Sequence, residues 1–249
     1  MISLDLLLIL AVFWIIVTWS LLNKIRLRKM LSRARGLWAL DLAGLMIHGA
    51  VVPLFQSLII FGALKLIWPI GEGLLTLPRW ISFFVAFVVV DYAYYWNHRL
   101  LHQKKLWRFH AVHHSGQVFD VFTTSRNSAL TTFLILYVWF NGIMFFLLSN
   151  REAYIWGVAV SNALDLLRHS GIAKWPRFAP FTWFISPRDH AWHHSEDMSD
   201  VNFGGNLNIW DRIHGTYHGS ENLPHQIGAP LGQNLWSAFW HGIPSGENQ

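Results

Sequence analysis

Eight of the 14 histidines in the chain fall in three short clusters whose spacing suits metal coordination. The clusters read H-x3-H, H-x2-H-H and H-x2-H-H, and their members are His98 and His102; His110, His113 and His114; and His190, His193 and His194. Side chains three or four residues apart share one face of a helix, so each cluster can direct two or three imidazoles at one point. Neutral imidazole is a ligand for iron, zinc, copper and nickel. Eight such ligands are too many for one tetrahedral zinc ion but fit two metals with open positions.

This density of histidine triples is far above what chance would give. With 14 histidines in 249 residues, about 0.04 H-x2-H-H triples are expected in the whole chain, whereas this chain has two. The chain also has no cysteine, which excludes disulfides, cysteine-ligated zinc, iron–sulfur clusters and a thiolate nucleophile. The sequence therefore predicts a metal centre with nitrogen ligands.

The composition is that of an integral membrane protein. Hydrophobic residues make up 53% of the chain and charged residues 13%, far below the charged share of a typical soluble domain. Apolar residues collect in long uncharged runs, and basic residues beside these runs account for much of the net charge of +5. This placement is typical of topology signals, so we expect a membrane, and no nucleic acid, among the partners.

The first apolar run extends from Leu6 to Leu22, and a basic stretch without acidic residues, 24–35, follows it. A cleaved signal peptide carries its positive charge before the apolar region, so we expect an uncleaved anchor with its N-terminus outside. Further apolar helices are expected at 41–65, 80–102, 127–150 and 153–164. The first of these contains Pro53 and is expected to kink there. Alternating crossings then place every clustered histidine on the cytoplasmic side.

The expected fold is all-α and integral to the membrane. It is a bundle of about four to five transmembrane helices with a cytoplasmic, histidine-rich cap that holds two metals. No repeat, linker or low-complexity segment divides the chain, so residues 1–249 are expected to form a single domain with a histidine-box core at about 80–217. From Ser170 onward the chain lacks a spanning run, and short helices and loops are expected there.

A carboxylate lies on the same helical stripe as the first histidine cluster. Asp91 precedes His98 and His102 by seven and eleven residues. A charge at membrane depth is costly and marks a functional position. Two roles are open for Asp91: to orient a metal-bound histidine, or to form an ion pair with Arg99 or Arg168 that packs two helices together.

Histidine coordination of two metals inside an apolar bundle suits dioxygen chemistry on a greasy substrate. Nitrogen ligands can leave a pair of irons with open positions for O2. Apolar walls limit the access of water and favour a lipid chain.

The histidine-rich stretches resemble a known family. DYAYYWNHRLLHQKKLWRFHAVHHS (91–115) is similar to the first two histidine boxes of the fatty acid hydroxylase superfamily, also called the sterol desaturase family. SPRDHAWHHSEDMSDVNFGGNLNIWDRIHGTY (186–217) is similar to its third box and the tail that follows. The resemblance implies a membrane-embedded di-iron oxygenase of the endoplasmic reticulum or bacterial inner membrane. Members act on fatty acyl chains, sphingolipids, sterols and carotenoids, or cleave alkylglycerol ethers with a pterin.

The resemblance also implies a ligand set and a cofactor. All eight clustered histidines would bind metal, and His169, at the end of the preceding helix, would be a ninth ligand. The cofactor would be two iron ions, for which zinc can substitute in a purified sample. Gly171 stands where many members have an asparagine, so any role of that asparagine is absent here. His214 and His48 are expected not to be ligands.

Three polar positions complete the expected site. Asp200 and Asn202 lie in the D-x-N-aromatic-G pattern of the family, where both would hydrogen-bond ligand histidines; with Asp91 they are the expected catalytic residues. Shaping the loop is an equal alternative for Asn202. Arg126 is expected either to hold a lipid headgroup or to pack against Asp120.

The function expected from these features is that of an O2-dependent di-iron hydroxylase, a monooxygenase that inserts oxygen into a C–H bond of a membrane lipid such as an acyl chain or sterol. A desaturase of the same substrates is the nearest alternative, because the same hydrogen abstraction leads to either product. A membrane metal transporter or metal-binding protein is a remote one, because transporters place ligands at mid-membrane.

The expected partners are a lipid substrate, the membrane and a separate electron donor. No cytochrome b5-like, flavin or ferredoxin domain is evident, so a ferredoxin, a cytochrome b5 or a reductase would supply electrons. Lys104, Lys105 and Arg108 form an expected docking patch for it. The expected location is a bacterial inner membrane, crossed several times, with the active site on the cytoplasmic side.

Overall fold

The structure is a computed structural model, and it describes residues 3–172, 174–176, 178–196, 198, 200–229, 231 and 234–243. This part of the chain is helical, without a β-strand and with isolated bridges such as Phe184 to Leu207. The expected all-α fold is therefore confirmed. The α-helices are α1 (Leu4–Leu22), α2 (Lys24–Leu31), α3 (Arg35–Met46), α4 (Val52–Leu54), α5 (Phe61–Ile67), α6 (Arg79–Phe84), α7 (Val90–Leu101), α8 (Lys104–His114), α9 (Ala129–Leu134), α10 (Leu136–Leu147), α11 (Glu152–Arg168), α12 (Pro187–His193), α13 (Ile209–His214) and α14 (Leu235–His241).

Several of these helices join into longer rods through π-helical turns. Ile47–Val51 (η1) and Phe55–Ile60 (η2) connect α3, α4 and α5, and Val85–Val89 (η4) connects α6 to α7. The first rod continues through Pro53, with a π-helical stretch on either side. Proline has no N–H to donate, and such bulges let a helix accommodate the missing bond.

Two of the expected crossings are long and apolar enough to span a bilayer in the part of the chain that the structure describes. They are α1 and the 33-residue rod Arg35–Ile67, and only 17% of each apolar window is buried within the protein. Large side chains such as Trp14, Ile15 and Leu58 are exposed on them. Exposed apolar faces of this extent are typical of contact with lipid.

Two of the other expected crossings are not single apolar helices: one is divided, and one carries charged and polar side chains. The predicted helix over 127–150 is divided into α9 and α10 by the extended backbone of Ile135. Arg79 to Leu101 forms one continuous rod, as expected, but its second half carries Asp91, His98 and Arg99. The predicted total of four to five crossings therefore stays a prediction.

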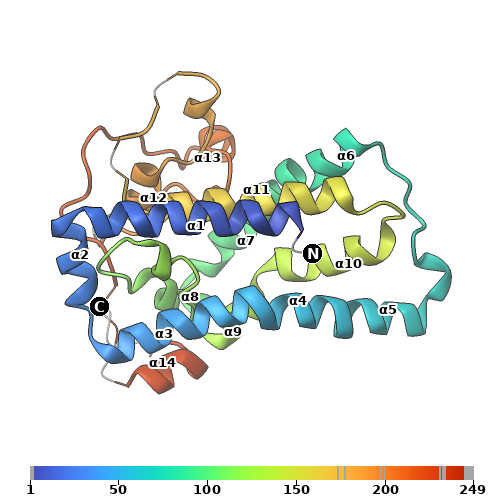
Figure 1. The fold of residues 1–249 in the computed structure, drawn as a ribbon, viewed down its shortest axis with the longest axis horizontal. Helices are drawn as coiled ribbons and strands as arrows, with labels where there is room; N and C mark the ends of the chain where they lie inside the picture. Colours follow the sequence, from blue (N-terminus) through green and yellow to red (C-terminus); the bar gives the residue numbers. More distant parts are fainter. Residues whose placement is uncertain are drawn as a thin grey trace.

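The helices are arranged so that the histidine-bearing segments gather at one end of the bundle (Figure 1). Helix α11 runs along α1 and packs against α6 and η4, while α10 packs against α5 and α7. The basic stretch after α1 lies at this same end, where Arg26 donates a hydrogen bond of 2.9 Å to the carbonyl of Ser170. The expectation that the basic stretch and the histidines share one side is consistent with this contact.

A buried ionic cluster ties α3 to the loop that follows α8. Arg126 is 1% exposed, and its Nε and Nη2 donate to the two carboxylate oxygens of Asp41 at 2.6 and 2.9 Å. Arg33 joins this cluster by donating to Asp41 and to Asp120. Arg126 therefore neither holds a lipid headgroup nor packs against Asp120, so both sequence expectations for it are wrong. Its partner is Asp41, and Asp120 pairs with Arg33. Sequence spacing gave no sign of this pairing, because Asp41 and Arg126 are 85 residues apart.

Candidate metal centre

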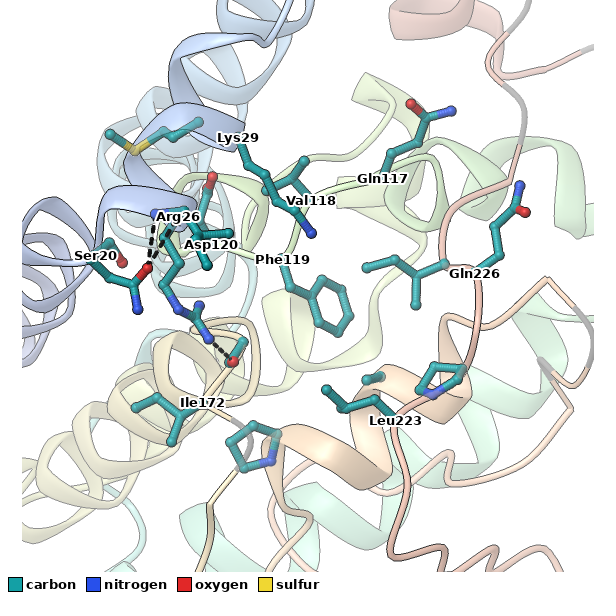
Figure 2. Close-up of a pocket in the computed structure, with 18 of the residues that line it drawn as sticks. Ser20, Arg26, Lys29, Gln117, Val118, Phe119, Asp120, Ile172, Leu223 and Gln226 are labelled. Carbon is teal, nitrogen blue, oxygen red and sulfur yellow. Dashed lines mark hydrogen bonds between the residues drawn. The ribbon is translucent and has the colours of Figure 1, made fainter.

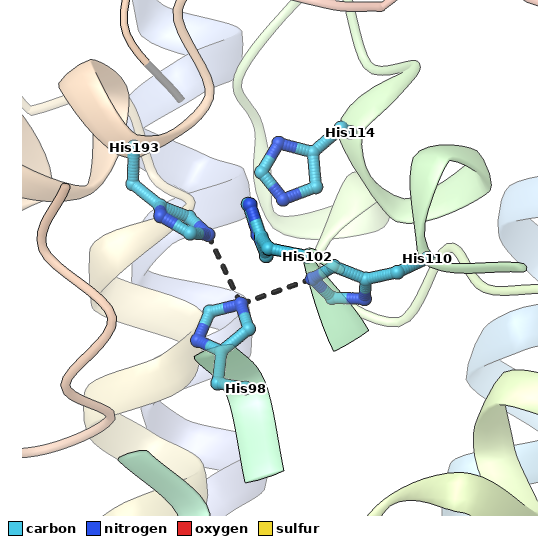
Figure 3. A group of neighbouring side chains, drawn as sticks. All are labelled: His98, His102, His110, His114 and His193. Atoms are coloured by element: carbon cyan, nitrogen blue, oxygen red, sulfur yellow. Dashed lines mark hydrogen bonds between the residues drawn. The ribbon is translucent and has the colours of Figure 1, made fainter. Parts of the chain in front are cut away.

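The structure brings all nine predicted histidines together in two adjoining groups. Within each group the ligand nitrogens lie within 4.8 Å of one another, and the groups are His98, His102, His110, His114 and His193; and His113, His169, His190 and His194. Figure 3 shows the rings of the first group, from α7, α8 and α12, turned toward one another. Segments that are far apart in the sequence therefore converge on two points.

Each H-x2-H-H triple is shared between the two groups. On α8, His110 and His114 belong to the first group and His113 to the second. In the triple at the end of α12, His190 and the C-cap residue His194 belong to the second group and His193 to the first. Residues i and i+4 point in nearly the same direction on a helix, whereas i+3 and i+4 are about 100° apart. A whole triple therefore does not converge on one point. Each triple instead links the two groups.

Local sequence signals place the helices that carry these rings. Helix α12 begins with a capping box, in which the Ser186 hydroxyl accepts from the amide of Asp189 and the Asp189 carboxylate accepts from the amide of Ser186. Pro187 occupies its first turn, where no N–H is needed. His102 is the C-cap residue of α7, which brings it to the start of the link to α8.

Backbone carbonyls fix the tautomer of four of the rings. The Nδ1 atom donates to the carbonyl of Phe203 from His98 (2.8 Å), of Val201 from His193 (2.7 Å), of Arg126 from His113 (3.1 Å) and of Asp165 from His169 (3.0 Å). A carbonyl oxygen only accepts, so Nδ1 carries the proton in each ring. The Nε2 lone pair is then left free for a metal, as in known metal sites.

The contacts between the rings show that these residues fit metal ions. The Nε2 atoms of His98 and His193 lie 3.0 Å apart, although both neutral rings carry their proton on Nδ1. Two lone pairs at this distance repel each other unless a cation lies near both. Other buried ring nitrogens of these groups have no hydrogen-bond partner among the described residues: Nε2 of His102, Nδ1 of His110, Nε2 of His114, Nδ1 of His190 and both nitrogens of His194. Buried polar atoms are rarely left without a partner.

Burial also keeps these rings in the form that binds metal. Desolvation is the main cause that lowers the pKa values of the histidines on α8 and α12 below the ordinary value for histidine, and positive charge on neighbouring rings would lower them further. Protonation would block the nitrogen that coordinates a metal. The neutral form is therefore the one that the fold favours.

The three predicted catalytic residues have different surroundings. Asp200 Oδ1 lies 3.3 Å from Nδ1 of His102, as expected for a residue that orients a ligand. This hydrogen bond lowers the pKa of Asp200. Asn202 hydrogen-bonds no histidine ring among the described residues: its side chain donates to the carbonyl of Asp189 and accepts from the amide of His218, and its φ of 54° is left-handed. The loop-shaping alternative is the one that these contacts favour for Asn202.

Asp91 neither orients a histidine ring nor forms an ion pair within the described part of the chain, so both sequence expectations for its contacts are wrong. Its carboxylate accepts from the amides of Asn206 and Leu207 at 2.6 and 3.0 Å and from Nε1 of Trp210 at 2.7 Å. The residue therefore anchors the loop after the third histidine cluster to α7. Three donated hydrogen bonds stabilise the negative charge of this buried carboxylate.

Sequence reasoning missed two acidic residues that support the histidines. Asp211 accepts from the amides of Phe203 and Gly204 at 2.7 and 2.8 Å. It therefore fixes the position of Phe203, whose carbonyl orients His98. Asp165 lies one helical turn before His169, with its Oδ1 atom 3.4 Å from Nδ1 of that ring. The four-residue spacing between Asp165 and His169 is visible in the sequence and predicts that the two side chains share one face of a helix.

The two histidines that were expected not to bind metal lie outside both groups. His214 stacks on Tyr95, with ring centroids 5.2 Å apart. His48 instead lines a cavity of about 40 Å³ beside the histidine rings, and its Nε2 atom has no hydrogen-bond partner in the part of the chain that the structure describes.

A larger cavity of about 610 Å³ lies behind the second histidine group (Figure 2). Arg26 and Lys29 line it on one side, and Gln226 on another. Phe119 lines it as well and stacks on the ring of His190, with centroids 5.9 Å apart and planes at 12°. Phe119 therefore contacts both this cavity and a candidate metal ligand.

Comparison with known proteins agrees with this site. The model of the fatty acid hydroxylase family matches residues 83–216, which include all nine histidines. The chain is 34% identical over 146 residues to ornithine lipid hydroxylase OlsE of Rhizobium tropici, covering 57% of this chain and 43% of that protein. It is 25% identical over 176 residues to human alkylglycerol monooxygenase, covering 64% and 38%. It is 30% identical over 154 residues to rat methylsterol monooxygenase 1, covering 57% and 50%.

The chain thus spans half or less of the length of these relatives. No solved structure matches it. The relatives are named as a hydroxylase and monooxygenases, which is the enzyme class predicted from the sequence. Because the family model covers more than half of the 249 residues, the chain belongs to the fatty acid hydroxylase family.

Proposed function

We propose that the protein is an O2-dependent di-iron monooxygenase that inserts oxygen into a C–H bond of a membrane lipid. The observation that carries this proposal is the convergence of nine histidines into a group of five and a group of four. The names of the relatives support it, since they describe enzymes that act on ornithine lipids, alkylglycerols and methylsterols.

The proposed ligands are the nine histidines of the two groups. When bound, a pair of redox-active irons supplies the activation of O2 that attack on an unactivated C–H bond requires. The protein contributes preset lone pairs: four rings are held by carbonyls with Nε2 free, and Asp200 holds His102. Groups of five and four nitrogens leave positions for O2 on each ion.

The buried surroundings limit the access of water to the site. Eight of the nine histidine residues are at most 9% exposed, and the side chain of His102 is 3% exposed. A dry site protects a reactive oxidant from side reactions and favours an apolar substrate. This burial is one reason to prefer an enzyme over a metal transporter, whose ligands must exchange with an aqueous path.

The proposed setting is a bacterial inner membrane, crossed several times by one domain, with the histidines on the cytoplasmic side. The exposed apolar faces of α1 and of the rod 35–67 support insertion. The basic stretch 24–35 supports the orientation, because positive charge beside a span favours the cytoplasm. A separate protein would supply electrons, and Lys104 and Lys105, both exposed, are proposed to receive it.

The experiment is lipid mass spectrometry of bacterial cells with and without the protein, grown under isotopically labelled O2. A lipid that gains one labelled oxygen supports hydroxylation, and one that loses two hydrogens shows desaturation instead. His194→Ala should abolish the product, while His241→Ala, an exposed histidine on α14, should not. If metal-loaded protein with a working reductant changes no lipid, the proposal is wrong.

A further inference from the structure

Two small cavities adjoin inside the helix bundle and share a polar wall. One, of about 40 Å³, lies beside the histidine rings, and the other, of about 100 Å³, extends between α7, α10 and α11 and includes apolar walls such as Ala86 and Val158. The residues that line both are Tyr94, Tyr137, Asp165, Arg168 and Gly205. A group held at this shared wall therefore lies next to the candidate metal ligands.

Arg168 at the shared wall has hydrogen-bonding groups to spare. Its side chain is 9% accessible, and its Nη2 donates to Asp165 Oδ1 at 2.8 Å. Its Nε and Nη1 atoms are buried and have no partner in the described part of the structure. Leaving donors of a charged group buried without an acceptor is costly, on the order of 1–3 kcal/mol or more. A ligand oxygen in the adjoining cavities would remove this cost.

The neighbouring carboxylate indicates the charge of that ligand. Asp165 is surrounded by protein, yet 39% of its side chain is accessible, because it lines the two cavities. It already balances the charge of Arg168, so a second carboxylate at the same place would be repelled by it. An uncharged acceptor, such as a carbonyl oxygen, meets no such repulsion.

We propose that Arg168 is a specificity-determining residue that binds a carbonyl oxygen of the lipid substrate. This proposal rests on the proposed function, because it names the part of the substrate that the same site recognises. A volume of about 100 Å³ holds only a few heavy atoms, since a water molecule occupies about 30 Å³. The remainder of the lipid would lie outside the cavity. Because five of the nine candidate metal ligands line the smaller cavity, a carbonyl held by Arg168 keeps the neighbouring carbons beside the metal centre.

The test compares two phospholipids that differ only in the carbonyl. Detergent-purified, metal-free protein is mixed with equal amounts of a diacyl phosphatidylcholine and its dialkyl ether analogue of the same chain length, and native mass spectrometry measures the first lipid bound. Wild type should prefer the diacyl lipid about tenfold, the size expected for one hydrogen bond to a charged group. Arg168→Met should reduce this preference to near one, and Arg168→Lys should retain part of it.

The matched control is Arg151→Met, which removes an arginine at the opposite end of the same helix, outside both cavities. This control should keep the wild-type preference. The proposal is overturned if wild type shows no preference for the diacyl lipid, or if Arg168→Met keeps that preference. Either result would mean that the cavities hold water and not a lipid carbonyl. Equal loss of both lipids from Arg168→Met would show a merely structural role and would also overturn it.

Activity separates this proposal from the proposed function. If the holoenzyme hydroxylates lipid and Arg168→Met, with full metal content, raises KM for an acyl substrate about tenfold with little change in kcat, both stand. If wild type prefers the diacyl lipid but oxidises no lipid, the proposed function fails while carbonyl binding is upheld. If lipid is oxidised without any carbonyl preference, only the role of Arg168 fails.

Discussion

The Nδ1 atom of His98 donates to the carbonyl of Phe203, and the amide of the same Phe203 donates to the carboxylate of Asp211. The orientation of a candidate metal ligand on α7 is thus set by an acidic residue on α13 whose own hydrogen bonds, within the described residues, go to Phe203, Gly204 and Thr216. Residues that orient metal ligands in this way usually affect metal affinity by about 10- to 100-fold.

Replacing Asp211 by asparagine should therefore weaken metal binding. Asparagine removes the negative charge that the amides of Phe203 and Gly204 share, so we expect metal affinity to fall about tenfold or more. The measurement is competition with a chelator, followed by metal analysis. The control is Glu72→Gln, which changes a surface ion pair with Lys65. Equal metal retention by Asp211→Asn and wild type would contradict this role.

Removing single histidines should distinguish the two groups from the rest of the chain. His110 belongs to the first group and His190 to the second, so His110→Ala and His190→Ala should each lower the metal content from two ions per chain toward one. His214→Ala removes a ring that stacks on Tyr95 outside both groups and should leave two. Elemental analysis of purified protein gives the ratio, and a His214 variant that loses metal would show that the assignment is incomplete.

The metal-free protein should lose stability as the pH falls. Burial lowers the pKa values of His110, His114 and His193 in the folded state, while unfolded histidine has a pKa of about 6.5. Below about pH 6.5 the unfolded chain binds more protons than the folded one, so the free energy of unfolding rises with pH and decreases on acidification. Thermal unfolding in detergent between about pH 7 and pH 5 measures this. A flat profile would mean that these rings titrate normally in the folded protein.

The buried ionic cluster should be important for stability. Arg126→Met leaves Asp41 inside the fold with one of its two arginine partners, and breaking a buried pair in this way costs about 3–5 kcal/mol. Arg79→Met removes an exposed pair with Glu152 at 3.5 Å and should cost less than about 1 kcal/mol. Thermal unfolding of both variants compares them. Similar melting temperatures would show that the Asp41 cluster contributes little.

Charge reversal should test the docking patch for the electron donor. Lys104 and Lys105 are exposed at the start of α8, and Arg108 donates to the carbonyl of His241. Lys104→Glu together with Lys105→Glu should slow turnover with the protein reductant, more so at low salt, because exposed charges steer association. Metal content should not change, and turnover with a small chemical reductant serves as the control. Unchanged turnover with the protein reductant would place the docking site elsewhere.

The sequence by itself predicted the helical fold, the apolar spans at Leu6–Leu22 and 41–65, and eight of the nine histidines that converge. Helical periodicity and apolar run length are local properties, so they can be read without knowing the fold. The family resemblance added His169, which belongs to none of the three histidine clusters.

Only the tertiary structure decided which partners these residues meet. It decided which histidines from different segments meet: His98 and His102 join His110, His114 and His193, whereas His169 joins His113, His190 and His194. The carboxylate of Asp91 accepts from the amide of Asn206, and Arg126 pairs with Asp41, which is 85 residues away in the sequence. A buried charge binds whichever opposite charge or donor the packing of helices brings within reach, and that packing depends on contacts throughout the chain.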